Sequence, residues 1–337
     1  MNKQIVNGMS SPFTGGLVYL VEDTEVQTFR KEDYTVCVRY YLCADTGEQF
    51  TTDEQDEQLC NELYNQYRVR HGIPFPDEIK KIREKYQLTF SQITQITGFG
   101  QNQWRQYENG CVPSESNGKS IVAISSREGM LTMLEACKNQ FDEKTFLKIK
   151  KNVLTAPETT IKDDSHFYFF GNSQRNLYNG YSEMDAGKLQ NMVQLIVSKE
   201  KGGVTKTKLN KEMFYCDFLS YRKNGRSISG LSYRAIQYGP VPEHYETVYD
   251  HVDGLVKTVV ESNDIEYELL LCDAPDTAFL TDEDVKVIDE VMAVLVGMKR
   301  ADVVALSHSE NGWLKYKDSH SMIPYDEAYT LKAFPAM

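Results

Sequence analysis

The stretch of residues 77–112 constrains the fold of this chain most, because its apolar residues recur at helical spacing between abrupt stops. It predicts a first helix over 77–87 that Asp77 caps, a second that starts at residue 89 or 91 and ends at Gly98, and a third over 101–108. The apolar residues expected to face one shared core are Ile79, Ile82, Tyr86, Ile93, Ile96, Trp104 and Tyr107. Short helices that follow each other across tight turns indicate a helix-turn-helix.

The third helix would expose amide and guanidinium side chains where a helix built only for solvent would carry Lys and Glu. Such groups near the start of a recognition helix bind base edges, Asn or Gln at adenine and Arg at guanine, and a polar residue of the preceding helix reaches phosphate. The residues that we expect to contact DNA are Gln92, Gln101, Asn102, Gln103, Arg105 and Gln106. The alternative is a three-helix packing unit with no role in DNA binding, since many small helical cores share the apolar spacing.

This stretch resembles the helix-turn-helix of the Cro/repressor superfamily. The resemblance rests on Ser91-Gln92 at the opening of the second helix, on the Tyr-Glu-Asn-Gly sequence of residues 107–110, and on Pro113. It implies that the chain binds operator double-stranded DNA.

The net charge of −12 is unusual for a protein that binds nucleic acid, but the charge is unevenly distributed. Residues 68–111 contain seven Lys and Arg residues against four Asp and Glu residues, so this segment is locally basic. So few cations predict weak DNA binding by a single copy, with a modest salt dependence. We therefore expect two copies on paired half-sites, brought together by homodimerisation or by a partner.

The composition is that of an ordinary globular protein, with 41% hydrophobic and 26% charged residues, and 337 residues allow two or three domains. No apolar run is long enough to span a membrane, and the N-terminus has no export signal, so we expect a cytoplasmic protein without a membrane partner. Seven scattered cysteines predict no disulfide framework. The sequence has no Gly-rich phosphate loop, and we expect no cofactor.

Residues 1–67 read as a small β unit followed by a helix. The expected strands are 16–21, 25–30 and 34–43, and the expected helix is 53–67. Two turns in this unit lie where the two knuckles of a zinc ribbon would lie, and their ligand positions are occupied by Ser11, Thr14, Cys43 and Thr46.

This layout of knuckles, hairpin, helix and helix-turn-helix resembles the MqsA antitoxin family, in which a zinc ribbon precedes a repressor-type DNA-binding domain. Of the four ligand positions that the resemblance assigns, only Cys43 can supply a thiolate, so we expect no zinc. Hydroxyl hydrogen bonds and apolar packing would then hold the two turns.

The rest of the chain divides into a second helical region, a linker and a C-terminal domain. We expect a polar turn over 113–118, helices over 126–139 and 142–153, and a linker over 155–184. In the C-terminal domain, the expected helices are 188–199, 207–223, 243–251, 282–298 and 301–307, with a short strand over 231–238, a rigid turn over 239–242 and a β-hairpin over 255–271. The predicted fold class is α+β, with domains 1–67, 68–154 and 185–337 around the linker.

The region of about residues 186–330 is similar to the Panacea domain, a family also found beside phage-related genes. The likeness rests on the Tyr-Gly-Pro-Val-Pro sequence of residues 238–242, on Leu306-Ser307-His308, on Trp313 and on Ile323-Pro324-Tyr325. It implies an antitoxin module that neutralises a toxin by direct binding. The residues that we expect at the toxin are Tyr238, Pro240, Val241, Pro242, His308 and Trp313. Alternatively, the Gly-Pro sequence only sets a turn and Trp313 belongs to the core.

These features together predict an antitoxin that binds a toxin protein and represses its own operon. A transcriptional regulator whose C-terminal domain senses a ligand or recruits a protease is the alternative. A hydrolase or metalloenzyme built on Cys216, Cys272 or the histidines His244, His251 and His308 is a remote third possibility. We expect no catalysis, because no motif or spacing localises a reaction among these residues.

Overall fold

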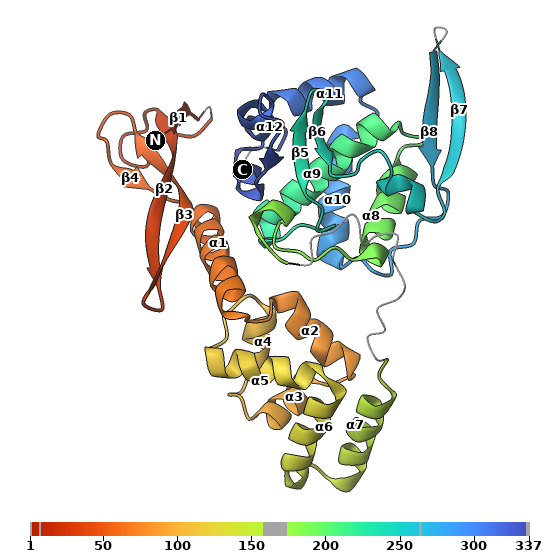
Figure 1. The fold of residues 1–337 in the computed structure, drawn as a ribbon. Coiled ribbons are helices and arrows are strands. Elements are labelled where there is room, and N and C mark those ends of the chain that lie inside the picture. The colour runs from red at the N-terminus through yellow and green to blue at the C-terminus, as the bar shows by residue number, and fades with distance from the viewer. Residues whose placement is uncertain (1, 7, 158–173, 263–264, 335–337) are drawn as a thin grey trace. The chain divides into compact units, whose positions relative to one another are not determined.

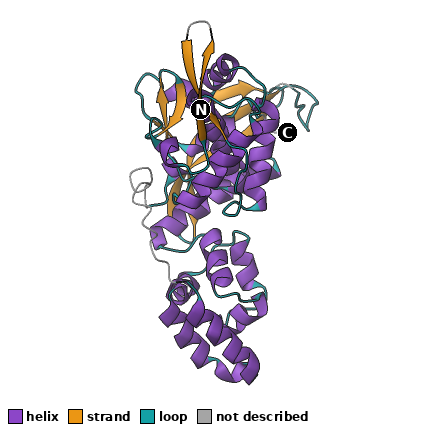
Figure 2. Ribbon diagram, turned by 90° about the vertical axis from the view of Figure 1, so that its right-hand side faces the viewer, coloured by secondary structure: helices purple, strands orange, loops and turns teal. Residues whose placement is uncertain are grey.

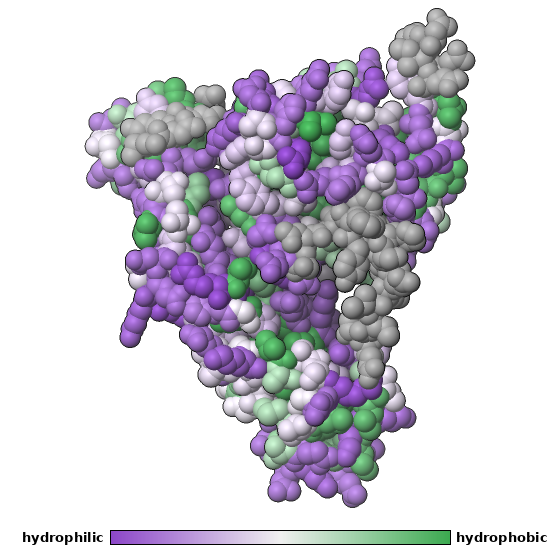
Figure 3. Space-filling model, viewed as in Figure 1, coloured by the Kyte–Doolittle hydropathy of each residue, from purple (hydrophilic) through white to green (hydrophobic). Residues whose placement is uncertain are grey.

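The computed structural model describes residues 2–6, 8–157, 174–262 and 265–334. The chain forms two compact units, residues 1–162 and 163–337, and its fold class is α+β as predicted (Figure 1). Residues 158–173, which make up more than half of the predicted linker over 155–184, lie outside the described residues. Hydrophilic residues cover much of the surface shown in Figure 3. None of the described helices is both long enough and apolar enough to cross a membrane.

The N-terminal unit begins with an antiparallel sheet in the order β1-β2-β3-β4. Its strands are Asn2–Ile5, Val18–Phe29, Glu32–Cys43 and Gln49–Phe50. The prediction of two separate strands before residue 30 is wrong, since β2 is continuous. The acidic residues between the two predicted strands belong to the ladder, where Glu22 lies opposite Arg39 and forms an ion pair of 3.3 Å with it.

The hairpin between β2 and β3 is tied to the rest of the unit through its two-residue turn. Helix α1 (Asp53–His71) packs on β3. At the turn, the Arg30 guanidinium donates to the backbone oxygens of Pro113 at 2.6 Å and Val112 at 2.7 Å. Arg68 of α1 donates to the Gly110 oxygen at 2.5 Å. Two arginines therefore hold the loop over residues 110–113.

Residues 76–155 form a block that contains helices and no strand (Figure 2). Its helices are α2 (Pro76–Lys85), α3 (Phe90–Thr97), α4 (Gln103–Glu108), α5 (Glu115–Ser125), α6 (Arg127–Ala136) and α7 (Glu143–Thr155), with a short 3-10 turn, η1 (Lys138–Gln140). The seven apolar residues predicted to face one core are all buried in it. Gly98 ends α3 in the left-handed conformation, with φ of 69°, as expected for a helix C-cap.

Two details of this block differ from the prediction. Asp77 is not the cap of α2, because the helix starts one residue earlier and Glu78 accepts from the backbone N–H of Phe75. The predicted polar turn over 113–118 is wrong as well, since α5 starts at Glu115. The Ser residues that suggested a loop supply its N-cap, where Ser114 accepts from the Asn117 N–H.

The C-terminal unit is arranged around α9 (Lys206–Asn224), which is buried on nearly every side. Helices α8 (Ala186–Lys199), α10 (Asp282–Leu295) and α11 (Arg300–Ser309) contact it. The sheet β6-β5-β9 consists of Gly239–Pro242, Tyr233–Ile236 and Met322–Ile323, and β7 (Val256–Ser262) and β8 (Ile265–Leu271) form the predicted hairpin (Figure 1). The remaining elements are α12 (Asn311–Tyr316), η2 (Leu177–Asn179), η3 (Val248–His251) and η4 (Tyr325–Thr330).

Two predictions for this unit are wrong. Residues 239–242 are not a turn but the edge strand β6, in which prolines are tolerated because one side of an edge strand needs no partner. The turn lies just before, at Gln237 and Tyr238. The helix predicted over 243–251 is reduced to η3, since His244 adopts a left-handed conformation with φ of 57° that interrupts a helix.

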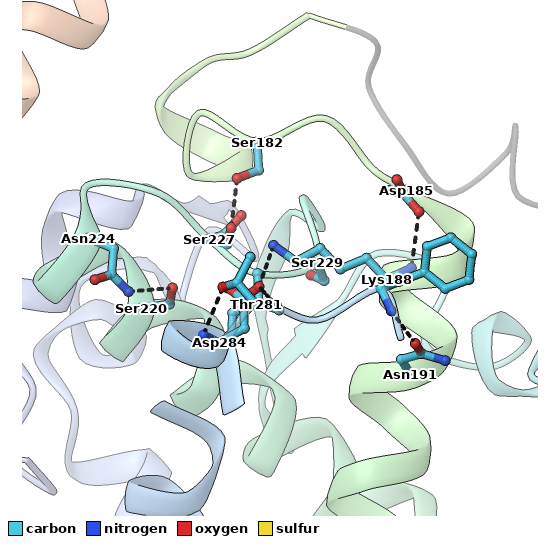
Figure 4. Close-up of polar contacts among 12 residues, drawn as sticks. Ser182, Asp185, Lys188, Asn191, Ser220, Asn224, Ser227, Ser229, Thr281 and Asp284 are labelled. Carbon is cyan, nitrogen blue, oxygen red and sulfur yellow. Dashed lines mark hydrogen bonds and ion pairs between the residues drawn. The ribbon is translucent and has the colours of Figure 1, made fainter. Parts of the chain in front are cut away.

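Buried polar contacts fix the elements around α9. Asp217 accepts from the backbone N–H groups of Ile228 and Ser229, from the Ser229 hydroxyl and from the Tyr233 hydroxyl. Ser182 donates to the Ser227 oxygen, and the N-caps of α8 and α10, Asp185 and Thr281, are drawn with this pair in Figure 4. All four donors to Asp217 come from residues 228–233, so this carboxylate fixes the segment that leads into β5.

Candidate functional sites

The start of α4 presents most of the residues predicted to contact DNA. Gln101, Asn102, Arg105 and Gln106 are exposed there. Asn102 adopts the left-handed conformation, with φ of 75°, immediately before the helix. Gln103 is less exposed, and its side-chain oxygen accepts from the Gly100 N–H at 3.0 Å. Gln103 therefore shapes the turn before the helix, while the other four point donors and acceptors at solvent.

Gln92, predicted to reach phosphate, lies in the first turn of α3. Its side-chain oxygen accepts from the Thr89 N–H at 2.9 Å, and the Thr89 hydroxyl accepts from the Gln92 N–H at 3.2 Å. This capping box occupies the carbonyl end of the Gln92 amide. The NH₂ end is the donor that a phosphate oxygen would need.

A cluster behind α4 fixes its orientation. The Arg83 guanidinium of α2 donates to both oxygens of Glu108, at 2.6 and 2.9 Å, and the Trp104 indole N–H donates to Glu108 at 2.7 Å. The bidentate geometry makes this a strong, directional contact. The helical block of residues 76–155 contains twelve Lys and Arg residues against nine Asp and Glu residues, so its net charge is positive.

The four degenerate zinc-ligand positions meet in space in the N-terminal unit. Thr14 Oγ1 lies 3.6 Å from Cys43 Sγ and donates to Asp45 at 2.5 Å. Hydrogen bonds from the hydroxyls of Ser11 and Thr46 are the largest causes that lower the pKa of the Cys43 thiol to about 6. The two turns thus bring three hydroxyl side chains around the single buried sulfur of Cys43. No group of three His, Cys, Asp or Glu side chains suited to a metal occurs in the described ranges.

The residues predicted to bind a toxin gather around the turn at Tyr238. Tyr238 is 64% exposed, whereas Pro240, Val241 and Pro242 are buried in β6. Two side chains hold this turn through hydrogen bonds to its backbone. Lys211 of α9 donates to the Pro240 oxygen at 2.9 Å, and the His308 ring hydrogen-bonds to the backbone of Tyr238. We call this surface the Tyr238 turn.

His308 and Trp313 flank the Tyr238 turn as a stacked pair. Their ring centroids lie 4.0 Å apart, with an angle of 4° between the planes. The Trp313 indole N–H donates to the Ile236 oxygen at 2.8 Å, and the Lys317 amine lies 5.0 Å from the Trp313 ring centroid. All six predicted residues are therefore in one place, but Tyr238 is the one that is broadly accessible.

The two lysines at this site, Lys211 and Lys317, were not singled out from the sequence. Lys211 is fully buried, and burial lowers its pKa to about 7. Burial also lowers the pKa of His308, and the charges of Lys211 and Lys317 lower it further. A lysine between Leu209 and Met213, in the apolar stripe of a buried helix, was the available signal for Lys211.

Gly239 shows how closely the turn packs on these groups. It has a φ of 100°, and a side chain at this position would meet Lys211 and Ser307 at 2.8 Å. Glycine is therefore required here both for its backbone conformation and for space.

The residues considered for a hydrolase do not form an accessible group. Cys216 is completely buried in α9, and burial raises the pKa of its thiol well above the usual value. A protonated thiol without solvent access is a poor nucleophile. His244 is exposed, whereas Cys272 is buried.

Part of the C-terminal unit matches a known protein family. Residues 209–314 match the family described as "Antitoxin SocA-like, Panacea domain". The match runs from α9 into α12 and contains all six residues of the predicted toxin-binding set. No curated protein and no solved structure matches the chain. The match supports an antitoxin role for the C-terminal unit, and the Cro/repressor and MqsA resemblances of the N-terminal unit stay predictions.

Proposed function

We propose that the chain is an antitoxin that binds a toxin protein through the Tyr238 turn and represses its own operon through α4. The observation that carries the first part is the convergence of Tyr238, His308 and Trp313 on one surface inside the region that matches an antitoxin family. The toxin would be held by direct binding that covers its active surface, without chemistry by the antitoxin.

The Tyr238 turn has the composition and rigidity of a binding hot spot. Tyrosine and tryptophan are enriched among the residues that dominate binding energy. Here Tyr238 is exposed, and Trp313 is buried beside the turn. Because Lys211 and His308 fix the backbone of the turn, Tyr238 loses little conformational freedom when a partner docks. The buried residues Pro240, Val241 and Pro242 would support this surface rather than touch the toxin.

The second part of the proposal is supported by the polar face of α4. Gln101, Asn102, Arg105 and Gln106 are exposed at the start of a short helix whose other face is buried, inside a basic block. These side chains match the donors and acceptors of adenine and guanine edges in the major groove. We further propose that two copies bind paired half-sites as a homodimer, because one such helix makes few phosphate contacts.

Toxin binding is tested with the product of an adjacent gene that is toxic when expressed alone. We expect the full chain to co-purify with that product and to restore growth. Tyr238→Ala should weaken the complex about 30-fold or more, the loss typical of a hot-spot residue. Tyr178→Ala is the matched control, because Tyr178 is also an exposed tyrosine of the C-terminal unit, at 47%, and should leave binding unchanged. A toxic neighbour that neither binds nor is neutralised would show the proposal to be wrong.

DNA binding is tested separately with the promoter of the chain's own operon. Asn102→Ala and Arg105→Ala should each weaken binding to the promoter about 5- to 150-fold relative to unrelated DNA, the range for loss of one base contact. Glu143→Ala, on the exposed first turn of α7, is the control. If both variants bind the promoter as tightly as the parent chain, α4 is not the reading helix.

A further inference from the structure

Arg105, the one cation on the exposed face of α4, lies over an aromatic ring. Its guanidinium carbon is 4.7 Å from the ring centroid of Phe90, the first residue of α3. The ring packs against the buried core of the helical block and is therefore held in place. A guanidinium at this distance from an aromatic face is attracted to it, so Arg105 is confined before any ligand arrives.

The same ring also meets Arg83, whose guanidinium carbon is 4.4 Å from its centroid. The charge of Arg83 is compensated by the bidentate pair with Glu108. Arg105, by contrast, is exposed and makes no ion pair within the described part of the chain. The Phe90 ring therefore contacts both arginines. The charge of Arg83 is neutralised by Glu108, whereas the charge and the N–H donors of Arg105 face solvent.

We propose that Phe90 is a positioning residue that holds the Arg105 guanidinium ready for a guanine, so that each operator half-site carries a G·C pair at Arg105. This inference rests on the proposed DNA binding. The planar fork of arginine fits the O6 and N7 acceptors of guanine in a bidentate manner, and such a contact requires a fixed orientation. The fork also fits a phosphate, but Arg105 lies on the exposed face of α4 beside Asn102 and Gln106, the face that a recognition helix turns to the base edges.

The experiment measures the affinity of the full chain for its own promoter site, mapped by footprinting, and for the same duplex with each guanine in turn replaced by 7-deazaguanine. The replacement removes the N7 acceptor and leaves the base pair intact. We expect one position in each half-site at which it weakens binding roughly 5- to 150-fold. This sensitivity should disappear in Arg105→Ala, which has no donor, and should be smaller in Arg105→Lys, because the lysine can still donate to N7 but lacks the planar fork.

Phe90 is then tested with a matched pair of variants. Phe90→Leu keeps an apolar side chain without an aromatic face and should lower the preference for the promoter over unrelated DNA about 2- to 5-fold, while affinity for unrelated DNA stays constant. Phe90→Tyr keeps the ring and should bind as the parent does. In an Arg105→Ala background, Phe90→Leu should have no further effect on this preference.

The outcomes separate this inference from the proposed function. If the promoter is not bound at all, both are wrong. If it is bound but no guanine position depends on Arg105, the guanine assignment is wrong and DNA binding stands. If Phe90→Leu weakens specific and unrelated DNA equally, or still lowers the preference without Arg105, Phe90 supports only the fold of the block.

Discussion

The two units anchor their exposed candidate binding residues differently. In the C-terminal unit, the Tyr238 turn is fastened by fully buried polar groups, Lys211 directly and Asp217 through the segment leading into β5. In the N-terminal unit, two of the side chains that hold α4 and the loop after it, Arg83 and Arg30, reach the surface, and the third, Arg68, is buried. A buried polar group that loses its hydrogen-bond partners destabilises the fold by its full desolvation free energy, whereas a surface group can form hydrogen bonds with water instead.

This difference predicts an order of effects. Single substitutions at the anchors of the C-terminal unit should cost much more stability than substitutions at the anchors of the N-terminal unit. Because the chain has two compact units, the measurement should follow two unfolding transitions, each assigned by its own spectroscopic probe.

The largest effect is expected at Asp217. Asp217→Ala leaves two backbone N–H groups and two hydroxyls without their buried acceptor, and should destabilise the C-terminal unit by about 3–5 kcal/mol. Asp217→Asn should cost less than half of this, because its amide oxygen can still accept from the N–H groups and the hydroxyls can rotate to accept from its NH₂. Denaturant unfolding monitored in the C-terminal transition checks both, and equal losses for Ala and Asn would contradict the hydrogen-bond explanation.

Glu108 is the strongest anchor of the N-terminal unit and should come second. Glu108→Ala removes the acceptor of Arg83 and Trp104 and should destabilise the helical block by about 2–3 kcal/mol, since its side chain is only 7% exposed. Promoter binding should fall at the same time, because α4 loses its support. Thermal unfolding of the N-terminal transition is the measurement. The neighbouring Glu84→Ala is a suitable control, because the Glu84 side chain is 53% exposed.

Lys211 offers a test that depends on pH. Its pKa is about 7 in the folded chain, well below its value in an unfolded chain, so the unfolded state binds more protons between the two values. Stability should therefore rise with pH through this window, by about 2 kcal/mol between pH 7 and pH 9. Lys211→Met should remove this pH dependence. The gain in stability of the variant over the parent chain should therefore be largest at pH 7 and below. A parallel pH dependence in parent and variant would show that Lys211 does not titrate there.

The sequence predicted those features that depend on local spacing. The core residues of the helical block, such as Trp104 and Tyr107, lie where their helical period placed them. The predicted turn over 113–118 was wrong because serine is common both in loops and at helix N-caps, and the serine before α5 is an N-cap.

The long-range contacts could not be predicted in this way. Nothing in the spacing of residues links Lys211 to Pro240, or Phe90 to Arg105, because these pairs meet only after the helices pack. The candidate residues of the Tyr238 turn were found through a family resemblance, and their division into one exposed tyrosine and a buried support is visible only in the structure.

The smallest expected effects concern the turn of the β2–β3 hairpin, where Arg30 and Lys31 both have positive φ, 50° and 71°. Such two-residue turns favour glycine and asparagine, and a long side chain there is strained. Lys31→Gly should therefore stabilise the N-terminal unit by about 0.5–1 kcal/mol. Arg30→Gly gains the same relief but loses the two bonds to Val112 and Pro113, and should be net destabilising by about 1 kcal/mol. If both substitutions stabilise the unit, the Arg30 contacts are too weak to brace the loop after α4, and the N-terminal unit depends on Arg83 and Arg68 alone for that support.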